Sequence, residues 1–371
     1  MKYYKSGKPN IANKEKKYVL QVLDSGDLSL GPVHKKFEQK FAKLIGVKYA
    51  VSVSSGTAGL HLAMIAAGIK RGDEVITTPF SFIASANCIL YVGAKPVFVD
   101  IDPDTYNINT ALIEKAITKK TKAILVVHIF GQSCDMDPIK KIAKKYKLKI
   151  VEDACESLLA SYCGQKVGTF GESAVFAFYP NKQITTGEGG MIVTNSKKYY
   201  DLFCSLRNQG RTSDMGWLDH KCLGYNYRMD ELSAAVGLAQ LERIKYLISE
   251  RKKNARRYNK YLSGYGDILK LPVTAKDNMH TWFVYTIQIL KIGTSRDLLI
   301  KKLAKQGIQA KPYLPSIHLF DFYRKKFGFK KGDFPVSEKV SRRSLSLPFY
   351  IGLVESDIKY ICQKLIKLIK Q

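Results

Sequence analysis

The sequence predicts an α/β fold: a mostly parallel central sheet flanked by helices, followed by a smaller C-terminal α+β part. Two observations lead to this prediction. Short runs of apolar and β-branched residues alternate with helix-length segments, which is typical of parallel sheets covered on both faces. From Asp230 onward the pattern changes to a long helical stretch. In such sheets, ligands bind beyond the carboxyl ends of the strands.

The expected strands of the central sheet all lie in the first 200 residues. They are Glu74–Thr78, Pro96–Ile101, Ala123–Val127, Leu148–Val151, Ala174–Phe178 and Met191–Thr194. Helical segments separate several of them, for example one that extends Ile113–Ala116 and one over Pro138–Tyr146.

The long helical stretch from Asp230 to Leu262 begins with acidic residues and ends with basic ones, which suits the helix dipole. Beyond it we expect a strand over Trp282–Leu290, a helix over Arg296–Gln306 and a closing helix over Ser356–Lys370. The sequence therefore predicts a large domain of residues 1–245, including the N-terminal segment, and a small α+β domain of residues 246–371.

Composition excludes several classes of protein. The 371 residues are 46% hydrophobic and 11% aromatic, far from the range of disordered or fibrous chains. The most apolar stretch, residues 50–68, is interrupted by five serine, threonine and histidine residues, so no membrane span is expected. The N-terminus lacks the features of a secretory signal. Seven scattered cysteines without CxxC or zinc-ligand spacing indicate free thiols, no metal site and a cytoplasmic protein.

The net charge of +28 raises the alternative of a non-catalytic nucleic-acid-binding protein. However, the excess is mostly lysine spread along the chain, without an arginine-rich arm or a known RNA-binding signature. A solvated lysine-rich surface explains the charge better, and its field would attract anionic metabolites such as nucleoside diphosphates.

Four segments carry candidate chemistry. Small residues at Val53–Leu60 precede a helix and could hold a phosphate, although alone they could be an ordinary helix cap. Carboxylates follow the strand at Val151–Glu156, and a lysine followed by a Gly-rich turn lies within Phe176–Gly190. A polar, aromatic loop at Leu223–Glu231 precedes the long helix. A phosphate cradle, an acid for a pyridinium nitrogen and a lysine for an aldehyde together describe a pyridoxal-phosphate site.

With these segments in view, the chain resembles the DegT/StrS-type nucleotide-sugar aminotransferases of fold type I, within the aspartate aminotransferase superfamily. The resemblance extends from Ser25–Pro32 to Ser344–Tyr350, and it is carried by SSGTAGLHLA, PFSFIASAN, VEDACES, FYPNKQITTGEGG and GYNYRMDELSAA. It implies a large cofactor-binding domain with a mostly parallel sheet, and the cofactor pyridoxal 5'-phosphate in its PLP and PMP forms.

The resemblance also implies roles for single residues. Lys182 would form a Schiff base with the cofactor, Asp153 would pair with the ring nitrogen, and Glu156 would lie at the ring hydroxyl. Phe82 would stack on the ring, although its position is also compatible with ordinary core packing.

Other matched positions concern the cofactor phosphate. Gly56 and Thr57, with Ser55, match the phosphate-binding turn, and Asn226 matches an asparagine that reaches the phosphate of the neighbouring subunit, which implies a homodimer with shared sites. Many relatives carry serine where this chain has Ala177, so one phosphate contact is missing here.

The reaction that the resemblance implies is transfer of an amino group from L-glutamate to a keto group of a nucleotide-linked deoxy sugar, at C4 in preference to C3. The product would serve surface glycan or lipopolysaccharide biosynthesis. Candidate substrate contacts are Tyr179, Tyr313 and His318, the last of which could equally be structural. The alternative on the same scaffold is a PMP-dependent nucleotide-sugar dehydratase, but those relatives have histidine in place of Lys182.

Overall fold

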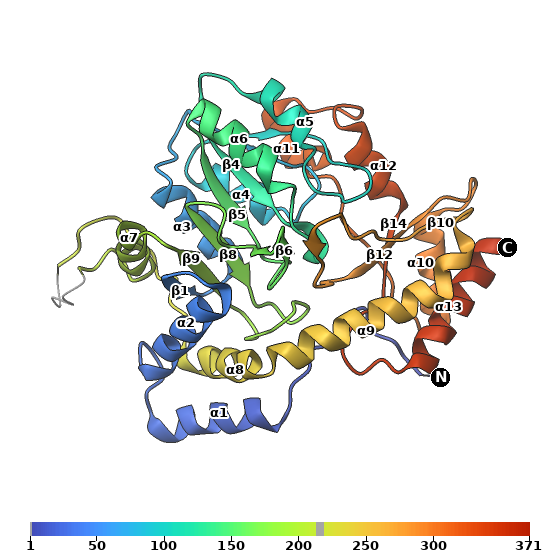
Figure 1. Cartoon of the computed structure of the whole chain (residues 1–371), viewed down its shortest axis with the longest axis horizontal. Coiled ribbons are helices and arrows are strands. Elements are labelled where there is room, and N and C mark those ends of the chain that lie inside the picture. The colour runs from blue at the N-terminus through green and yellow to red at the C-terminus, as the bar shows by residue number, and fades with distance from the viewer. Residues whose placement is uncertain (1, 213–218) are drawn as a thin grey trace.

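A computed structural model of the chain describes residues 2–212 and 219–371, and a seven-stranded sheet forms its centre (Figure 1). In spatial order the strands are β1 (Tyr49–Val53), β9 (Gly190–Thr194), β8 (Ser173–Ala177), β5 (Lys149–Asp153), β4 (Thr121–Val127), β2 (Glu74–Thr77) and β3 (Lys95–Phe98). The pairs among β3, β2, β4, β5 and β8 are parallel, whereas β9 is antiparallel to both β8 and β1. The predicted α/β class and the six expected strands are confirmed.

Strand β1 was not predicted, because Tyr49–Val53 runs directly into the small-residue segment and reads as part of it. Helices cover both faces of the sheet. On one face lie α3 (Gly56–Ala66), α4 (Ala84–Tyr91) and α7 (Lys197–Arg207), and on the other α2 (Pro32–Ile45), α6 (Met136–Tyr146) and α8 (Glu231–Glu242). Side chains of one strand alternate between the two cores: Val175 packs under α3, whereas Ala174 and Phe176 pack under α2. The helix expected to extend Ile113–Ala116 is only a short turn, α5 (Thr110–Ile113), followed by a 3₁₀ turn.

The prediction of one long helix from Asp230 is wrong in one respect, because the segment forms two helices, α8 and α9 (Ile244–Leu262). Asp230 caps α8, where its side chain accepts a hydrogen bond of 2.8 Å from Ser233 N. The helical path breaks at Arg243, with φ −105° and ψ 4°, before α9 begins. At this break the Arg243 guanidinium contacts Glu15 of α1 (Asn13–Ser25) and the Asn10 carbonyl, so tertiary contacts accompany the bend.

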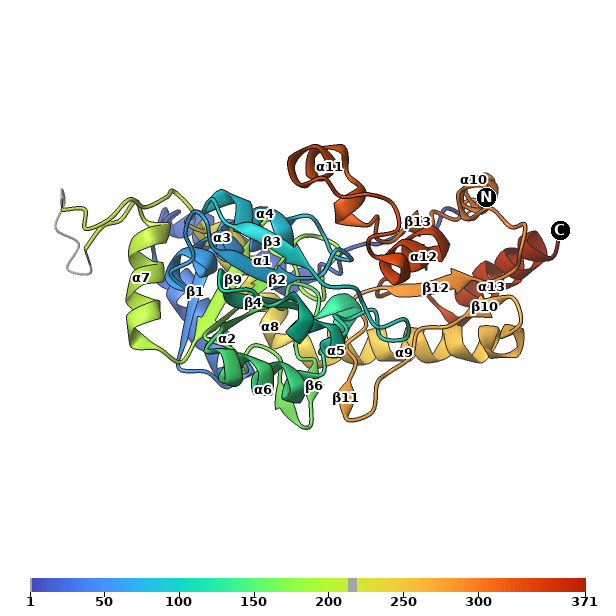
Figure 2. The same cartoon turned by 90° about the horizontal axis from the view of Figure 1, so that it is seen from above.

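A second, antiparallel sheet lies beside the first, and α9 runs alongside it (Figure 2). Its strands in order are β10 (Leu269–Lys270), β12 (Tyr285–Ile289), β14 (Ser344–Leu347) and β13 (Lys311–Pro312), and α10 (Arg296–Lys305) and α13 (Glu355–Lys370) complete its core. The strand and the two helices expected here are confirmed within a few residues. Helices α11 (Asp321–Phe327) and α12 (Pro335–Arg343) follow β13, and Tyr323 of α11 packs against Phe98 of the first sheet. The domain boundary near residue 245 stays a prediction.

The N-terminal residues pack with the second sheet, whereas the sequence placed them with the first. Tyr4 is buried in the core of the second sheet. Its amide donates to the Gly307 carbonyl at 2.7 Å, and its carbonyl accepts from Gln309 N at 2.9 Å. Phe349 N donates to the Ser6 carbonyl at 3.1 Å. These bonds join residues more than 300 positions apart in sequence.

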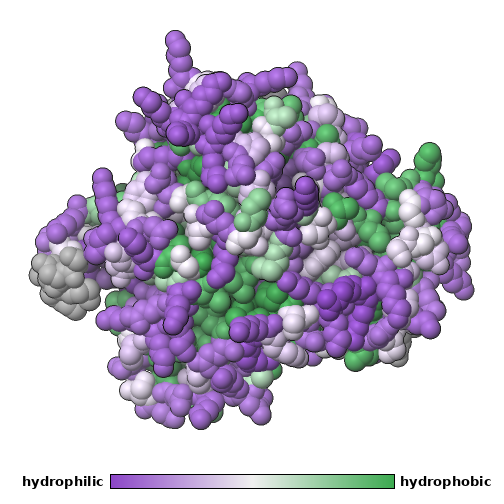
Figure 3. Space-filling view, in the orientation of Figure 1, coloured by the Kyte–Doolittle hydropathy of each residue, from purple (hydrophilic) through white to green (hydrophobic). Residues whose placement is uncertain are grey.

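The remaining elements are short. A small three-stranded sheet consists of β11 (Asn278–Met279), β6 (Ser161–Tyr162) and β7 (Gln165–Lys166), and single 3₁₀ turns occur at Glu114–Ala116, Ile129–Gly131, Ser263–Tyr265 and Ile317–Leu319. Among the residues that the structure describes, no helix combines the length and the apolar character needed to cross a bilayer. Hydrophilic side chains cover most of the face drawn in Figure 3, with apolar ones gathered mainly near its centre.

Candidate active site

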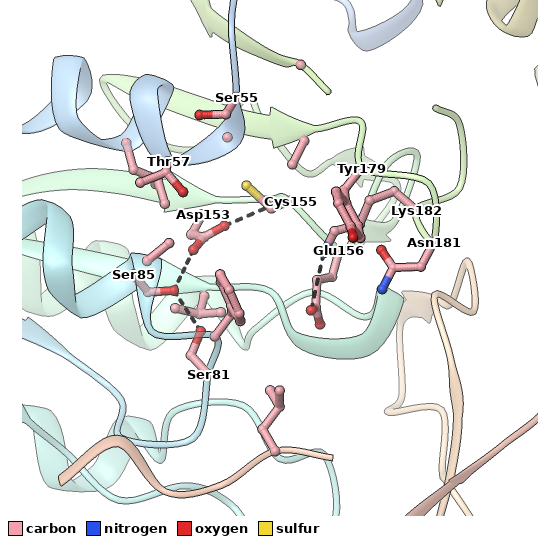
Figure 4. A pocket seen from close by; sticks show the side chains of 18 of the residues that line it. Ser55, Thr57, Ser81, Ser85, Asp153, Cys155, Glu156, Tyr179, Asn181 and Lys182 are labelled. Atoms are coloured by element: carbon pink, nitrogen blue, oxygen red, sulfur yellow. Dashed lines mark hydrogen bonds and ion pairs between the residues drawn. The ribbon is translucent and has the colours of Figure 1, made fainter. Parts of the chain in front are cut away.

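A cavity of about 430 Å³ opens where β5 and β8 end and α3 begins (Figure 4). All the site residues predicted from the sequence line it, except Asn226 and His318. Those that do are Ser55, Gly56, Thr57, Phe82, Asp153, Glu156, Tyr179, Lys182 and Tyr313. They come from both halves of the chain, and the position beyond the carboxyl ends of the parallel strands is the one expected for this class of sheet.

Asp153 is the last residue of β5, and its carboxylate is buried at one side of the cavity. One carboxylate oxygen accepts a hydrogen bond of 2.6 Å from Ser85 Oγ, and the other accepts one of 3.2 Å from Cys155 N. The Ser85 hydroxyl is in turn 2.6 Å from the Ser81 hydroxyl. These contacts fix the orientation of the carboxylate. Among the residues that the structure describes, none forms an ion pair with it, which leaves its negative charge available to a bound group.

Lys182 and Glu156 form the opposite side of the cavity. The Lys182 amine Nζ lies 3.4 Å from Glu156 Oε1 and 4.1 Å from the centroid of the Phe283 ring. Glu156 Oε2 accepts a hydrogen bond of 3.1 Å from Phe130 N. Burial raises the pKa of the Glu156 carboxyl, and the nearby Lys182 charge opposes this shift only in part.

The pKa shift of Glu156 predicts how a Glu156→Gln substitution affects stability. Because the folded pKa of Glu156 is raised, the folded protein is most stable with this carboxyl protonated. That contribution to the free energy of unfolding is fully present below the unfolded pKa of about 4.3 and is lost as the pH rises through the folded pKa. An amide stays neutral and still accepts from Phe130 N. At pH 8 we therefore expect the cofactor-free variant to melt about 1–3 °C above the unchanged protein, with no difference at pH 4.

Thermal unfolding followed by circular dichroism at both pH values measures this difference. Glu188→Gln is the matched control, because Glu188 lines the same cavity with an exposed side chain. A lower Tm for Glu156→Gln at pH 8 would show that the ion pair with Lys182 outweighs the cost of burying the carboxylate.

The N-terminus of α3 forms a third side of the cavity. Ser55 caps this helix, accepting a hydrogen bond of 3.1 Å from Ala58 N. The backbone N–H groups of the first helical residues have no carbonyl acceptor within the helix. A Cβ atom at Gly56 would lie 2.7 Å from Ala177 Cβ and 3.0 Å from Cys155 Sγ. Only glycine therefore allows α3 to approach β8 this closely, and the approach brings the helix end to the carboxylate side of the cavity. Such a helix end favours phosphate.

Three aromatic residues lie around the remaining space. Phe82 and Tyr179 are 60% and 52% exposed, so both present ring surface to a ligand rather than to the protein core. The alternative of core packing for Phe82 is thereby removed. Tyr313 is half-buried, and burial, with a smaller contribution from the Glu156 charge, raises the pKa of its hydroxyl.

Two predicted residues lie outside this cavity. Asn226 is exposed, but its neighbours Tyr225 and Tyr227 line an adjoining, more open cavity of about 430 Å³ together with Ser55 and Thr57. His318 is fully buried, and its Nε2 lies 3.1 Å from Glu338 Oε1. The substrate contact expected at His318 is therefore corrected to a packing role, because a ring enclosed in this way does not reach the cavity.

Sequence reasoning missed several lining residues, of which Ser85 is the most informative. It belongs to the PFSFIASAN segment, in which only Phe82 was selected. The available signal was two serines, Ser81 and Ser85, one helical turn apart in an otherwise apolar segment. Asn181 and Cys155 were also missed, although each adjoins a selected residue.

Comparison with known proteins gives the same assignment as the residues in the cavity. The model of the DegT/DnrJ/EryC1/StrS aminotransferase family matches residues 9–366. The chain belongs to this family. Among its relatives is GDP-perosamine synthase of Escherichia coli O157:H7, 40% identical, with 98% of each chain covered.

Solved structures of family members agree. Helicobacter pylori PseC, an aminotransferase involved in the biosynthesis of pseudoaminic acid, superposes with a TM-score of 0.94 at 29% identity over the full length of both chains. Spr1654 of Streptococcus pneumoniae in its PMP form has a TM-score of 0.92 at 27% identity, covering 100% of this chain and 99% of that one. The protein is a pyridoxal-phosphate-dependent sugar-nucleotide aminotransferase of fold type I.

The residues in the cavity fit this cofactor. Its aldehyde needs a primary amine, its ring nitrogen an acid and its phosphate a set of amide donors. Lys182, Asp153 and the start of α3 supply these groups around one space. The close approach that Gly56 permits is the local feature that brings the amide donors near the acid.

Proposed function

We propose that this aminotransferase moves an amino group from L-glutamate to the C4 keto group of a nucleotide-linked deoxy sugar, in the biosynthesis of a surface glycan or lipopolysaccharide. The ITTGEGG run after Lys182 resembles enzymes that act at C4, and the relative named GDP-perosamine synthase favours a GDP-linked substrate. All seven cysteines are free, which suits the cytoplasm as the place of the reaction.

The observation that carries the proposal is the shared cavity of Lys182, Asp153 and the N-terminus of α3. When bound, pyridoxal phosphate supplies a ring that withdraws electrons from the carbon that carries the amino group. The reaction also needs groups that hold or move protons and groups that orient the substrates. We assign these tasks to the side chains around this cavity.

Lys182 has two proposed tasks. Its amine would hold the aldehyde carbon of the cofactor between turnovers and, when free, would move a proton between the substrate carbon and the cofactor. Asp153 would hold the proton on the ring nitrogen, since its carboxylate has neutral hydrogen-bond donors and, within the described part of the chain, no ion-pair partner. Glu156 lies close enough to exchange a proton with Lys182, since Oε1 and Nζ are 3.4 Å apart.

The other proposed contacts orient the bound groups. Gly56, Thr57 and Ser55 would hold the phosphate at the helix end, and Phe82 would lie against the ring. Tyr179 and Tyr313, which line the same cavity, are proposed to contact the sugar nucleotide. We also propose a homodimer in which Asn226 reaches the partner's cofactor phosphate, which its exposed position permits.

The visible spectrum of the purified protein loaded with pyridoxal phosphate tests the proposal. Adding L-glutamate should bleach the visible band, and adding the correct keto-sugar nucleotide should restore it. A panel of 4-keto and 3-keto sugars on GDP, UDP and dTDP then identifies the substrate. A band that L-glutamate leaves unchanged would overturn the proposed donor, and recovery only with 3-keto sugars would overturn the proposed C4 selectivity.

The missing phosphate contact at Ala177 leads to a prediction of improved cofactor binding. Ala177 lines the cavity beside Gly56, so a serine there would place a hydroxyl next to the start of α3. We expect Ala177→Ser to tighten pyridoxal-phosphate binding by about 3- to 10-fold, the value of roughly one hydrogen bond. Equilibrium dialysis of the apoprotein against the cofactor measures the change.

Ala177→Gly is the matched control, because it alters the same position without adding a hydrogen-bonding group. Weaker binding in Ala177→Ser would mean that the added oxygen crowds Gly56 and Cys155 instead of reaching the phosphate.

A further inference from the structure

Arg251 of α9 contacts the backbone of Lys182, although it is not among the residues that line the cavity. The side chain is buried, and its Nη2 donates a hydrogen bond of 2.8 Å to the Lys182 carbonyl. Its Nη1 donates to the carbonyls of Trp282 and Phe283 at 3.2 and 3.1 Å. One guanidinium therefore ties the segment that carries the lysine to the segment that leads into β12.

Keeping a charge at this position costs free energy. Burial alone lowers the pKa of Arg251 to about 10, so the group is still protonated at neutral pH. Its hydrogen-bond partners here are neutral carbonyls, and the guanidinium carbon also lies 5.8 Å from the centroid of the Phe349 ring. A planar guanidinium has donors on separate nitrogens and can bind both segments at once, which an apolar side chain of similar size could not do.

The second segment also reaches the amine of the same lysine. The Phe283 ring lies 4.1 Å from Lys182 Nζ, and Phe283 N donates to the Phe130 carbonyl at 2.9 Å. Phe130 N donates to Glu156 Oε2, and Glu156 Oε1 lies 3.4 Å from Lys182 Nζ. The contacts thus form a closed circuit that starts at the Lys182 carbonyl, passes through Arg251 and ends at the Lys182 amine.

We propose that Arg251 is a positioning residue for Lys182: it fixes the lysine backbone and the Phe283 segment relative to each other, and thereby holds the amine in its reactive place. This inference rests on the proposed bonding of Lys182 to the cofactor. A fixed amine adds to the aldehyde of pyridoxal phosphate, with loss of water, faster than an amine that samples many orientations. Without Arg251, the direct link from the Lys182 carbonyl to the Phe283 segment would be lost, and the longer contact of 3.4 Å from Gln183 Nε2 to Thr281 Oγ1 would remain between the two segments.

The test measures how fast the apoprotein bonds to added pyridoxal phosphate, recorded as the rise of the visible band in a stopped-flow spectrometer. The variants are Arg251→Met, Arg251→Lys and the matched control Arg257→Met. Arg257 lies on the same helix, is half-buried and donates to Asn254 Oδ1 and the Leu353 carbonyl, which are not part of the circuit. Circular dichroism melts of the apoproteins show which variants fold.

We expect bonding to be about tenfold slower in Arg251→Met and within twofold of the unchanged rate in Arg257→Met. Arg251→Lys should recover part of the rate, because an ammonium keeps the charge but has all its donors on one atom. A folded Arg251→Met that bonds at the unchanged rate would overturn the inference, as would equal slowing in Arg257→Met. If Arg251→Met does not fold, an unchanged rate in folded Arg251→Lys would overturn it.

The result is distinguishable from a failure of the proposed function. If the unchanged protein forms no visible band with pyridoxal phosphate, the bonding of Lys182 itself is wrong, whatever the Arg251 variants do. If the unchanged protein forms the band and Arg251→Met forms it equally fast, only the positioning role fails.

Discussion

Lys182→Ala is expected to abolish the visible band of the bound cofactor and to lower the rate of transamination by about 10³-fold or more. The variant loses the amine that bonds to the aldehyde and also the group that moves the proton. No other lysine lines the cavity among the described residues, so none is placed to take over either task. Absorbance spectra, and a coupled assay of 2-oxoglutarate release from L-glutamate, measure the two losses.

The matched control for this substitution is Lys197→Ala, which removes an exposed lysine that forms an ion pair with Asp201 on α7. It should keep both the band and the rate. A Lys182→Ala protein that retains the visible band and its response to L-glutamate would refute the assignment of the bonding lysine.

Asp153→Asn is expected to lower turnover by about 10²-fold while cofactor binding and folding change little. The amide has the shape of the carboxylate: its oxygen can still accept from Cys155 N, and its NH2 group can donate to the Ser85 hydroxyl, which can then donate to the Ser81 hydroxyl. It lacks the negative charge that keeps a proton on the ring nitrogen, so the ring withdraws electrons less effectively. Steady-state kcat and pre-steady-state bleaching with L-glutamate both report this loss.

Ser85→Ala separates the charge of Asp153 from its orientation. This variant keeps the carboxylate but removes the 2.6 Å hydrogen bond that orients it. We expect a loss of about 3- to 10-fold, the value of roughly one ordinary hydrogen bond, because Asp153 keeps its charge and its bond from Cys155 N. If Asp153→Asn were as active as the unchanged protein, the carboxylate would have no part in the reaction.

Much of the fold was readable from the sequence because its strands are strongly apolar and its helices are well marked. Runs such as Ala123–Val127 have few alternatives to a buried strand. The main site residues could also be predicted from the sequence. Asp153 is the last residue of one buried strand and Lys182 follows another, and the carboxyl ends of neighbouring strands meet at one edge of the sheet. Their approach to one cavity is a consequence of the sheet topology.

The features that sequence reasoning missed depend on contacts between distant segments. The break at Arg243 coincides with contacts to residues 10 and 15, more than 220 positions earlier. The partner of Asp153 is Ser85, on a helix that precedes it by 68 positions. His318 belongs to a segment that resembles a substrate-binding one, yet its ring is enclosed by the fold. Apart from the pair of serines at 81 and 85, these contacts leave no periodic or local pattern in the sequence.

The pairing of Tyr4 with Gly307 and Gln309 has a consequence for the order in which the protein can assemble. During synthesis, Tyr4 and Ser6 leave the ribosome long before their partners, which lie about 300 or more positions later, from Gly307 to Asp357. These residues must therefore wait, without their native partners, until residues 307–357 have emerged. The seven-stranded sheet, whose strands all lie before residue 195, has no such delay.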